Sequence, residues 1–478
     1  MNKNNDNFNR LAIKAGFFYV LTQLLVRGIT FLTTPIYTRL VDTAQYGQLR
    51  VYESWLLIFV PLMSLGLYRG VERAKYDYPD KYDEYVSASQ TLSYISISIF
   101  GVVFVCFYKP ISRFLGMNPL LFFIMFLYIF AYTSTLYFQR REKQKLQYKM
   151  VTRVTIATML PATVFSIMYL AVGNRLGYSE YLVEFRVVGY YLPQILVGFF
   201  LTYLIIKQGR CLYDKTYWKY GLMYSIPLIP EQLSIQIMNQ SDKIMIQKMI
   251  GADSAGIFSL ATTVSYIMWI IEESVWNAWL PWLYEKISRQ EEKDIERPWI
   301  QIAIIFCLMS LVIVFITPEI VLILGGEGYE EACYLIAPMT VGTLFRFFSY
   351  IYSSMQNYYM KTKFVAFGTI LSMFLNVVLN YIGIINWGYQ AAAYTTAFSY
   401  FMLMVVQGIL EKKIAGKCII PIWKMVLISL GVFGASIGIM QIFSWDSLLR
   451  WSIASLIGGI GAIRLLFVIK KELSISQK

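Results

Sequence analysis

The chain alternates long apolar segments with short polar loops along its 478 residues. A helix needs about 20 apolar residues to cross the hydrocarbon core of a bilayer, and these segments are close to that length. The pattern therefore predicts an all-α integral membrane protein with 14 transmembrane helices. The predicted spans lie near 15–37, 51–68, 87–107, 118–138, 154–173, 186–206, 220–240, 254–282, 299–323, 332–356, 365–385, 390–410, 425–443 and 449–469.

The positions of the basic residues predict how these spans are oriented. Of the 42 Lys and Arg, 30 fall on the alternate loops that include both ends of the chain, and only 7 fall on the loops between them. Because basic residues beside membrane segments stay on the cytoplasmic side, we expect both termini to be cytoplasmic. The segment 140–153, with six Lys and Arg, marks that side most clearly.

Composition agrees with a membrane protein and narrows the choice of partners. Hydrophobic residues make up 57% of the chain, charged residues only 15%, and the mean hydropathy is +0.53, whereas soluble domains carry about 25% charged residues. The net charge of +13 is spread over short loops rather than gathered in one block. We therefore expect contact with anionic lipid head groups and no binding of nucleic acid.

A short repeat divides the predicted spans into two sets. RLVDTAQYGQL begins at Arg39 after the first span, and KMIGADSAGIF begins at Lys248 after the seventh. An interval of six spans predicts two pseudo-symmetric six-helix halves in parallel orientation, with a substrate site between them near the midplane. The predicted parts are a cytoplasmic tail at 1–14, an N-terminal half at 15–210, a C-terminal half at 211–413, and two additional helices with a cytoplasmic tail at 414–478.

The chain lacks the residues that several kinds of enzyme need. It contains no histidine, which excludes Ser-His-Asp hydrolysis and His-ligated metal sites. No glycine-rich phosphate loop is present, and the predicted outer loops are too short to form a catalytic domain. We therefore expect no enzyme activity, no bound metal and no resident cofactor.

Proline is frequent in the predicted spans. Nine of the fourteen prolines lie within spans or at their ends, where proline frees a backbone carbonyl and bends the helix. Bent helices around a polar cavity suit a transporter. Proline is also generally commoner in membrane helices than in soluble ones, so both interpretations stay open.

Three stretches resemble the polysaccharide flippases of the MOP superfamily, which are relatives of the lipid II flippase and of the MATE drug exporters. These stretches are PIYTRLVDTAQYGQ at 35–48, SLGLYRGVERAKYDY at 64–78 and YSIPLIPEQLSIQIMNQSDKIMIQKMIGADSAGIFS at 224–259. The resemblance implies transport of undecaprenyl-pyrophosphate-linked oligosaccharides across the bacterial cytoplasmic membrane for surface polysaccharides such as O-antigen, capsule or exopolysaccharide. A polymerase and a chain-length regulator of the same pathway are the protein partners it implies.

Ionisable side chains inside a membrane are costly, so each is a candidate functional residue. Arg27 lies twelve residues into the first predicted span with Gln23 on the same helix face, and Arg346 lies in the middle of the tenth. Arg69 and Arg73 follow the second span at its predicted cytoplasmic end. Because a guanidinium fits two phosphate oxygens at once, we predict that Arg27 and Arg346 bind the pyrophosphate, with Arg69 and Arg73 at the entrance.

Each arginine also has a simpler interpretation. Arg27 and Arg346 would then be structural partners of buried carboxylates, and Arg69 and Arg73 ordinary charges of a cytoplasmic loop. Arg186 opens the sixth predicted span, where its side chain has room to snorkel outward.

The seventh and eighth predicted spans supply the remaining candidates. Gln236, Asn239 and Lys243 form a polar stripe at helical spacing, and we assign them to substrate binding together with Trp269, because aromatic faces and amides suit sugar rings. Aromatic residues at the membrane interface are the alternative reading of Trp269. A buried carboxylate is suited to coupling transport to a proton or sodium gradient, as in antiporters of the superfamily. The candidates for this coupling are Glu231, Asp242, Glu272 and Glu273.

Two other transport functions fit the same pattern. A MATE-like cation-coupled drug exporter would need a mainly acidic cavity, whereas the deepest charges here include two arginines. A lipid II flippase would differ only in the head group that it carries. The last two spans either guide the lipid tail or serve as a peripheral anchor.

Overall fold

The structure is a computed structural model that describes residues 2–444 and 446–476. Its regular secondary structure in these ranges is entirely helical, and the chain forms two compact units, Met1–Gln240 and Ser241–Lys478. The division falls inside one helix, α10. The boundaries predicted at 210 and 413, and the six-plus-six symmetry, stay predictions.

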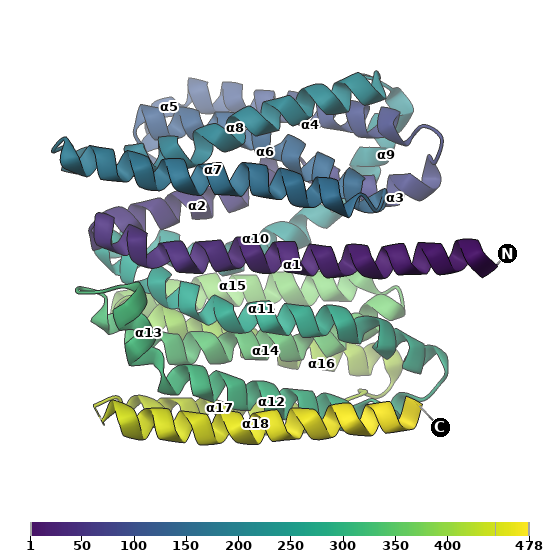
Figure 1. The fold of residues 1–478 in the computed structure, drawn as a ribbon, viewed down its shortest axis with the longest axis vertical. Helices are drawn as coiled ribbons and strands as arrows, with labels where there is room; N and C mark the ends of the chain where they lie inside the picture. The colour runs from purple at the N-terminus through teal and green to yellow at the C-terminus, as the bar shows by residue number, and fades with distance from the viewer. Residues whose placement is uncertain (1, 445, 477–478) are drawn as a thin grey trace. The chain divides into compact units, whose positions relative to one another are not determined.

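In the described part of the chain, the first unit contains nine α-helices and the start of a tenth, labelled in Figure 1. Their bounds are α1 Asn2–Leu40, α2 Thr43–Met63, α3 Gly70–Asp77, α4 Tyr82–Cys106, α5 Tyr108–Leu115, α6 Pro119–Gln144, α7 Tyr148–Arg175, α8 Leu182–Gly209, α9 Lys215–Ser225 and α10 Ile229–Met249. Within this unit α8 packs against α4, α6 and α7, and α1 packs against α7.

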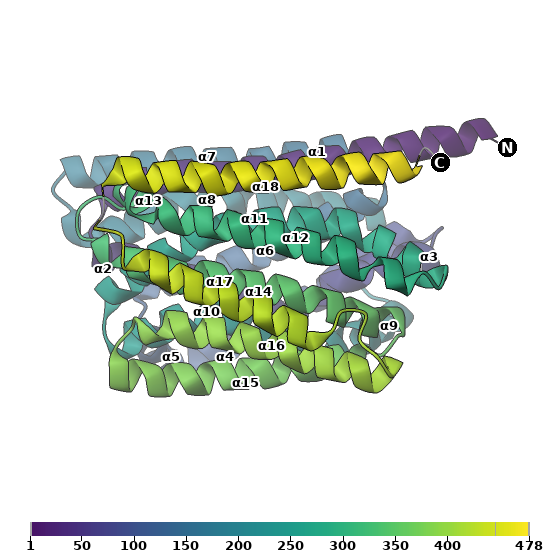
Figure 2. The same ribbon diagram turned by 90° about the horizontal axis from the view of Figure 1, so that it is seen from below.

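Among the residues that the structure describes, the second unit contains eight further α-helices. Their bounds are α11 Ala252–Ser288, α12 Glu296–Phe315, α13 Thr317–Leu324, α14 Cys333–Tyr358, α15 Thr362–Trp387, α16 Ala391–Ala415, α17 Ile422–Met440 and α18 Ser447–Ser476. The most deeply buried is α14, which packs against α11, α12, α16 and α17. Figure 2 shows α18 running alongside α12 within this unit.

The helices support a multi-pass membrane protein. Among the described residues, ten helices are long and apolar enough to cross a membrane, and an eleventh span is possible if the bent pair α2 and α3 is counted. Twelve of the 14 predicted spans each coincide with one helix, and the spans at 220–240 and 299–323 are each divided between two, while α1, α2, α10 and α18 are not among the ten. The count of 14 spans and the cytoplasmic position of both termini therefore stay predictions.

The sequence repeat coincides with two turns of equal length. In each, a two-residue break separates consecutive long helices, at 41–42 between α1 and α2 and at 250–251 between α10 and α11. Asp42 starts α2 by accepting a hydrogen bond from the Gln45 amide at 2.7 Å, while the Gln45 side chain bonds back to the Asp42 amide. Gly251 stands at the matching position before α11 with φ of +151°, a region that favours glycine.

Proline marks two of the breaks within predicted spans. The span at 220–240 is divided between α9 and α10 by a short 3-10 turn, Ile226–Leu228, that contains Pro227. Pro61 lies near the end of α2, and the axis then turns by 71° into the segment Leu67–Asp77. Glycine allows this turn, because Gly66 adopts φ of +57°.

Close helix contacts in the first unit depend on glycine. A Cβ atom added at Gly198 of α8 would lie 2.4 Å from the carbonyl oxygen of Ala131 in α6, and one at Gly189 would lie 2.8 Å from the carbonyl oxygen of Phe165 in α7. These two residues let α8 lie directly against both neighbours. The contacts bring side chains of α6, α7 and α8 together around one cavity.

Candidate substrate and ion sites

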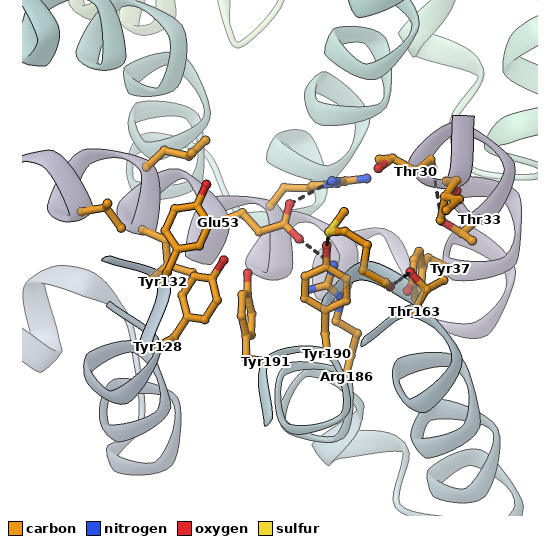
Figure 3. A pocket seen from close by; sticks show the side chains of 16 residues that line it. Thr30, Thr33, Tyr37, Glu53, Tyr128, Tyr132, Thr163, Arg186, Tyr190 and Tyr191 are labelled. Carbon is orange, nitrogen blue, oxygen red and sulfur yellow. Dashed lines mark hydrogen bonds and ion pairs between the residues drawn. The ribbon is translucent and has the colours of Figure 1, made fainter. Parts of the chain in front are cut away.

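The first unit contains a cavity of about 250 Å³ among α1, α2, α6, α7 and α8 (Figure 3). Much of its wall consists of polar and aromatic side chains. These are Thr30, Thr33, Thr163, Tyr37, Tyr128, Tyr132, Tyr190, Tyr191, Arg50, Arg186 and Glu53. Tyr37 is near the end of α1 and Arg186 near the start of α8, so the cavity extends to the predicted outer end of this unit.

Glu53 joins two arginines at this cavity. Its carboxylate accepts a hydrogen bond from Arg50 Nη1 at 2.9 Å and another from Arg186 Nη2 at 2.6 Å. Arg50 also donates to the hydroxyl of Tyr46 at 2.7 Å. Arg186 is only 5% exposed. Two guanidiniums and one carboxylate leave the wall with a formal charge of +1.

The tyrosines form a continuous aromatic surface. The ring centroids of Tyr128 and Tyr191 lie 4.6 Å apart, and those of Tyr190 and Tyr191 lie 5.1 Å apart. The guanidinium carbon of Arg186 lies 4.3 Å from the centroid of Tyr190. In Figure 3 the hydroxyls of Tyr128 and Tyr191 point to the side on which Glu53 lies. This wall offers ring faces, hydroxyls and positive charge in one small space.

Sequence reasoning did not identify this cavity. Arg186 was expected to snorkel outward, and that expectation is wrong, because the side chain is buried against Glu53 of α2. The available signal was Glu53 itself, a carboxylate inside the predicted span 51–68, with Arg50 three residues before it. An ionisable residue within a span should be treated as a functional candidate.

Arg27 lies on α1, one turn before the cavity residue Thr30. Its side chain is half-buried, and it is not among the residues that line the cavity. The side chain of Gln23 lies outside the part of the chain that the structure describes. The predicted role of Arg27 and Gln23 in substrate binding therefore stays a prediction.

Arg69 and Arg73 lie at the bend that follows α2. Arg69 ends the 3-10 helix Leu67–Arg69 and interacts electrostatically with Glu231 of α10. Arg73 is exposed on α3, with Nε 3.0 Å from Asp77 Oδ2. The structure thus places both arginines at one end of the first unit, and their role at an entrance stays a prediction.

Three predicted residues meet in the second unit. Arg346 of α14 is 8% exposed, its guanidinium carbon lies 4.0 Å from the centroid of the Trp269 ring, and its Nη2 lies 3.8 Å from Glu272 Oε2. This last distance is too long for a hydrogen bond. In the described part of the chain, Nε and Nη2 of Arg346 and Oε2 of Glu272 have no hydrogen-bond partner. The group is therefore buried, charged and incompletely bonded.

Asp242 lies in a network of neutral polar groups in the same unit. Its buried carboxylate accepts hydrogen bonds from Asn380 Nδ2 at 2.5 Å and from Thr396 Oγ1 at 2.9 Å. The Asn376 amide oxygen accepts from Asn380 Nδ2 at 3.3 Å and from Ser241 Oγ at 3.4 Å. The described residues contain no group of three or more Cys, Asp or Glu that would hold a metal ion. The oxygens in this network come instead from one carboxylate, the Asn376 amide and hydroxyls, while Asn380 presents its amide nitrogen.

The other predicted residues lie apart from these groups. Gln236 and Asn239 are half-buried on α10, and Lys243 is buried with Nζ 6.0 Å from the centroid of Tyr266. Glu273 is exposed, although its neighbour in sequence is fully buried. The predicted roles of these four polar residues stay predictions.

Solved structures with the same fold are transport proteins. The lipid II flippase MurJ, in an inward closed conformation, matches with a TM-score of 0.66 and 14% identity, covering 96% of this chain and 99% of that one. An inward-facing multidrug resistance MATE family transporter of the MOP superfamily matches with a TM-score of 0.64 and 13% identity, covering 83% and 98%. The chain therefore shares the fold of these two transport proteins.

Sequence comparison identifies the family within this class. The model of the polysaccharide biosynthesis protein family matches residues 12–286, and the chain belongs to that family. A Haemophilus influenzae protein described as Lsg locus putative protein 1 is 23% identical over 376 residues, which cover 76% of this chain and 89% of the relative. An uncharacterized membrane protein of the same organism is 24% identical over 375 residues, 75% and 87% of the two chains. The resemblance seen in the sequence motifs is confirmed.

Proposed function

We propose that the chain is a flippase of the bacterial cytoplasmic membrane. It moves undecaprenyl-pyrophosphate-linked oligosaccharide repeat units to the outer face for surface polysaccharide synthesis. Two helical halves alternate in access, and arginines bind the pyrophosphate while the lipid tail stays in the bilayer. A polymerase and a chain-length regulator of the same pathway are the proposed protein partners.

The observation that carries this proposal is the buried arginine of the second unit in a chain of the polysaccharide biosynthesis family. Arg346 keeps two nitrogen donors without hydrogen-bond partners among the described residues. A buried donor without a partner costs free energy, and a phosphate oxygen would satisfy it. Trp269 beside the guanidinium suits the first sugar of the glycan. We propose that Arg27 contributes a second guanidinium, with Arg69 and Arg73 at the cytoplasmic entrance.

The test is flipping of a fluorescent undecaprenyl-pyrophosphate oligosaccharide in proteoliposomes. Wild type, Arg346→Ala, Arg346→Lys and Arg27→Ala are compared at equal reconstitution. We expect flipping by wild type, loss with either alanine variant, and partial activity with Arg346→Lys, because lysine keeps the charge but not the two-pronged geometry. Full transport by a normally folded Arg346→Ala variant would remove this residue from the site.

The same vesicles separate the alternative functions. Flipping of lipid II in preference to several oligosaccharide lipids would identify a lipid II flippase. Efflux of a cationic dye, without flipping of any lipid, would identify a MATE-like drug exporter.

We further propose that Asp242 couples transport to a cation gradient. Carboxylate, amide and hydroxyl oxygens are the ligands that hard cations prefer, and Asp242, Asn376 and Thr396 bring such oxygens together around the Nδ2 of Asn380 in a buried place. This donor set favours Na⁺ at Asp242. Glu272 is the candidate for a proton, because its neighbour Arg346 lies beyond hydrogen-bond distance.

Coupling is tested by imposing one gradient at a time. We expect a sodium gradient to accelerate flipping by wild type and not by Asp242→Asn, which keeps the size of the side chain but removes its charge. Acceleration by a proton gradient alone, abolished in Glu272→Gln, would assign coupling to the other carboxylate. Equal flipping under both gradients and under none would refute coupling at either residue.

A further inference from the structure

The cavity of the first unit retains unused hydrogen-bonding capacity. Nη1 of Arg186 and the hydroxyl of Tyr37 are buried in its wall without a hydrogen-bond partner in the described ranges. Arg186 donates a hydrogen bond to Glu53 through Nη2, so Nη1 of the same guanidinium is left as a donor for a ligand. Together with the formal charge of +1, this donor points to an anionic ligand.

The size and surface of the cavity limit what that ligand is. A volume of about 250 Å³ is below the roughly 300–1,000 Å³ of pockets that hold drug-sized molecules, so there is room for a single sugar ring. Tyrosine faces pack against the apolar side of such a ring, and tyrosine and threonine hydroxyls bond its hydroxyl groups. Tyr128 and Tyr191 from two different helices supply both kinds of contact.

We propose that this cavity binds a carboxylate-bearing sugar of the transported glycan, such as a uronic acid. Arg186 Nη1 donates to the sugar carboxylate, and the tyrosine wall holds the ring. The proposal rests on glycan transport as the function of the chain. On this proposal the cavity selects acidic repeat units, and it is separate from the pyrophosphate site proposed around Arg346.

A pyrophosphate fits this cavity less well than a carboxylated sugar. To bind both Nη atoms of Arg186, it would have to break the 2.6 Å hydrogen bond that Nη2 donates to Glu53. It also has no apolar face to place against tyrosine rings. A neutral sugar would use the tyrosines but would leave Arg186 Nη1 without a partner.

The simpler view is that the ion pairs are only structural, with Arg186–Glu53 holding α8 against α2 and Arg50–Glu53 lying within α2. The two views predict different results for two variants. If the pairs are only structural, Arg186→Gln and Glu53→Gln both weaken the unit and impair function in the same direction. If the cavity binds an acid, Arg186→Gln removes its net charge and weakens binding, while Glu53→Gln raises the charge to +2 and strengthens binding.

Binding is measured on the purified full-length protein by saturation-transfer NMR titration. The observed ligands are sodium glucuronate and glucose, and inorganic pyrophosphate, which has no C–H protons, is added as a competitor. We expect glucuronate to bind more tightly than glucose by about ten-fold or more, the usual difference for a hydrogen bond to a charged group. Arg186→Gln should abolish this preference, and Glu53→Gln should keep or increase it.

The matched control is Arg450→Gln. Arg450 is also 5% exposed and bonds a carboxylate, with Nη2 2.6 Å from Glu319 Oε1, but it lies in the second unit and not in this cavity. It should leave the preference for glucuronate unchanged. Tyr128→Phe removes only a hydroxyl and should weaken glucuronate and glucose alike, by a few-fold. This variant tests the cavity even if Arg186→Gln does not fold.

Three binding results would overturn the proposal. These are equal binding of glucuronate and glucose by wild type, parallel losses in Arg186→Gln and Glu53→Gln, and displacement of glucuronate by pyrophosphate with higher affinity. Displacement by pyrophosphate would show that the cavity binds the phosphates of the lipid carrier and not the sugar.

Flipping separates this inference from the proposed function. Proteoliposomes receive an undecaprenyl-pyrophosphate oligosaccharide that contains glucuronic acid, or the same lipid with that carboxyl reduced to an alcohol. We expect wild type to prefer the acidic lipid and Arg186→Gln to flip the two lipids at the same rate. Failure to flip either lipid would reject the flippase function, whereas equal flipping of both by wild type would reject only the acidic-sugar site.

Discussion

Replacing Gly198 by alanine should force α6 and α8 apart. The added Cβ would lie 2.4 Å from the carbonyl oxygen of Ala131 and 2.6 Å from its carbonyl carbon, whereas ordinary contact begins near 3.4 Å. The overlap of about 1 Å is with backbone, which cannot rotate away as a side chain would. Overpacking of this kind costs about 1–3 kcal/mol, and a backbone clash belongs at the upper end. Alanine regains about 1 kcal/mol of helix propensity, so we expect a net loss of about 2 kcal/mol.

The assay is thermal unfolding of the purified protein in detergent, with Gly431→Ala as the control. Gly431 lies in α17, and a Cβ added there meets nothing within 4 Å. The control should be neutral or slightly stabilised, because alanine only improves the helix. Gly198→Ala should also weaken glucuronate binding, because α6 and α8 both supply tyrosines to the cavity. An unfolding temperature of Gly198→Ala equal to that of Gly431→Ala would show that the two helices do not lie this close.

Four further substitutions test other features of the fold, all by unfolding in detergent. Asp42→Ala removes the cap of α2 and should cost about 1 kcal/mol, and an unchanged unfolding temperature would contradict the capping geometry. Arg73→Ala should leave stability unchanged, because its ion pair with Asp77 is solvent-exposed, and a clear loss would place this pair in a packed environment. Glu272→Leu and Arg346→Leu should each destabilise more than the double variant, because each single change leaves a buried charge without its neighbour. Additive losses would show that the two side chains do not interact.

The apolar pattern was enough to predict the class of fold and the position of nearly every long helix. It was not enough to predict where helices break. The predicted span 299–323 is divided at Ile316 between α12 and α13, and Pro318 follows directly at the start of the new helix. Other prolines, such as Pro161 in α7 and Pro193 in α8, lie inside continuous helices. Hydropathy does not distinguish these cases, because neighbouring helices decide whether the backbone bends.

The charged sites were only partly predictable for a related reason. Arg50 and Glu53 are three residues apart on one helix, so their pairing follows from helical spacing. The partner from α8, Arg186, is 133 residues further along than Glu53, and no local rule joins them. Arg346 and Glu272 were both recognised as charges within spans, but their proximity depends on how α11 packs against α14. Sequence thus identifies buried charges, and tertiary packing decides which of them share a site.

The two arginine sites differ in the hydrogen bonding between each arginine and its neighbouring carboxylate. This difference determines which hydrogen bonds a ligand must break before it binds. Arg186 bonds Glu53 at 2.6 Å, so a ligand that required both Nη atoms would have to break a short, charge-assisted hydrogen bond. Arg346 stands 3.8 Å from Glu272 without a hydrogen bond, so phosphate oxygens can occupy its donors at lower cost. This difference supports the proposed assignment of a bidentate pyrophosphate to Arg346 and of a carboxylate that needs only one further donor to Arg186. Shortening the Glu272 side chain with Glu272→Asp should accordingly change affinity for inorganic pyrophosphate and leave affinity for glucuronate unchanged.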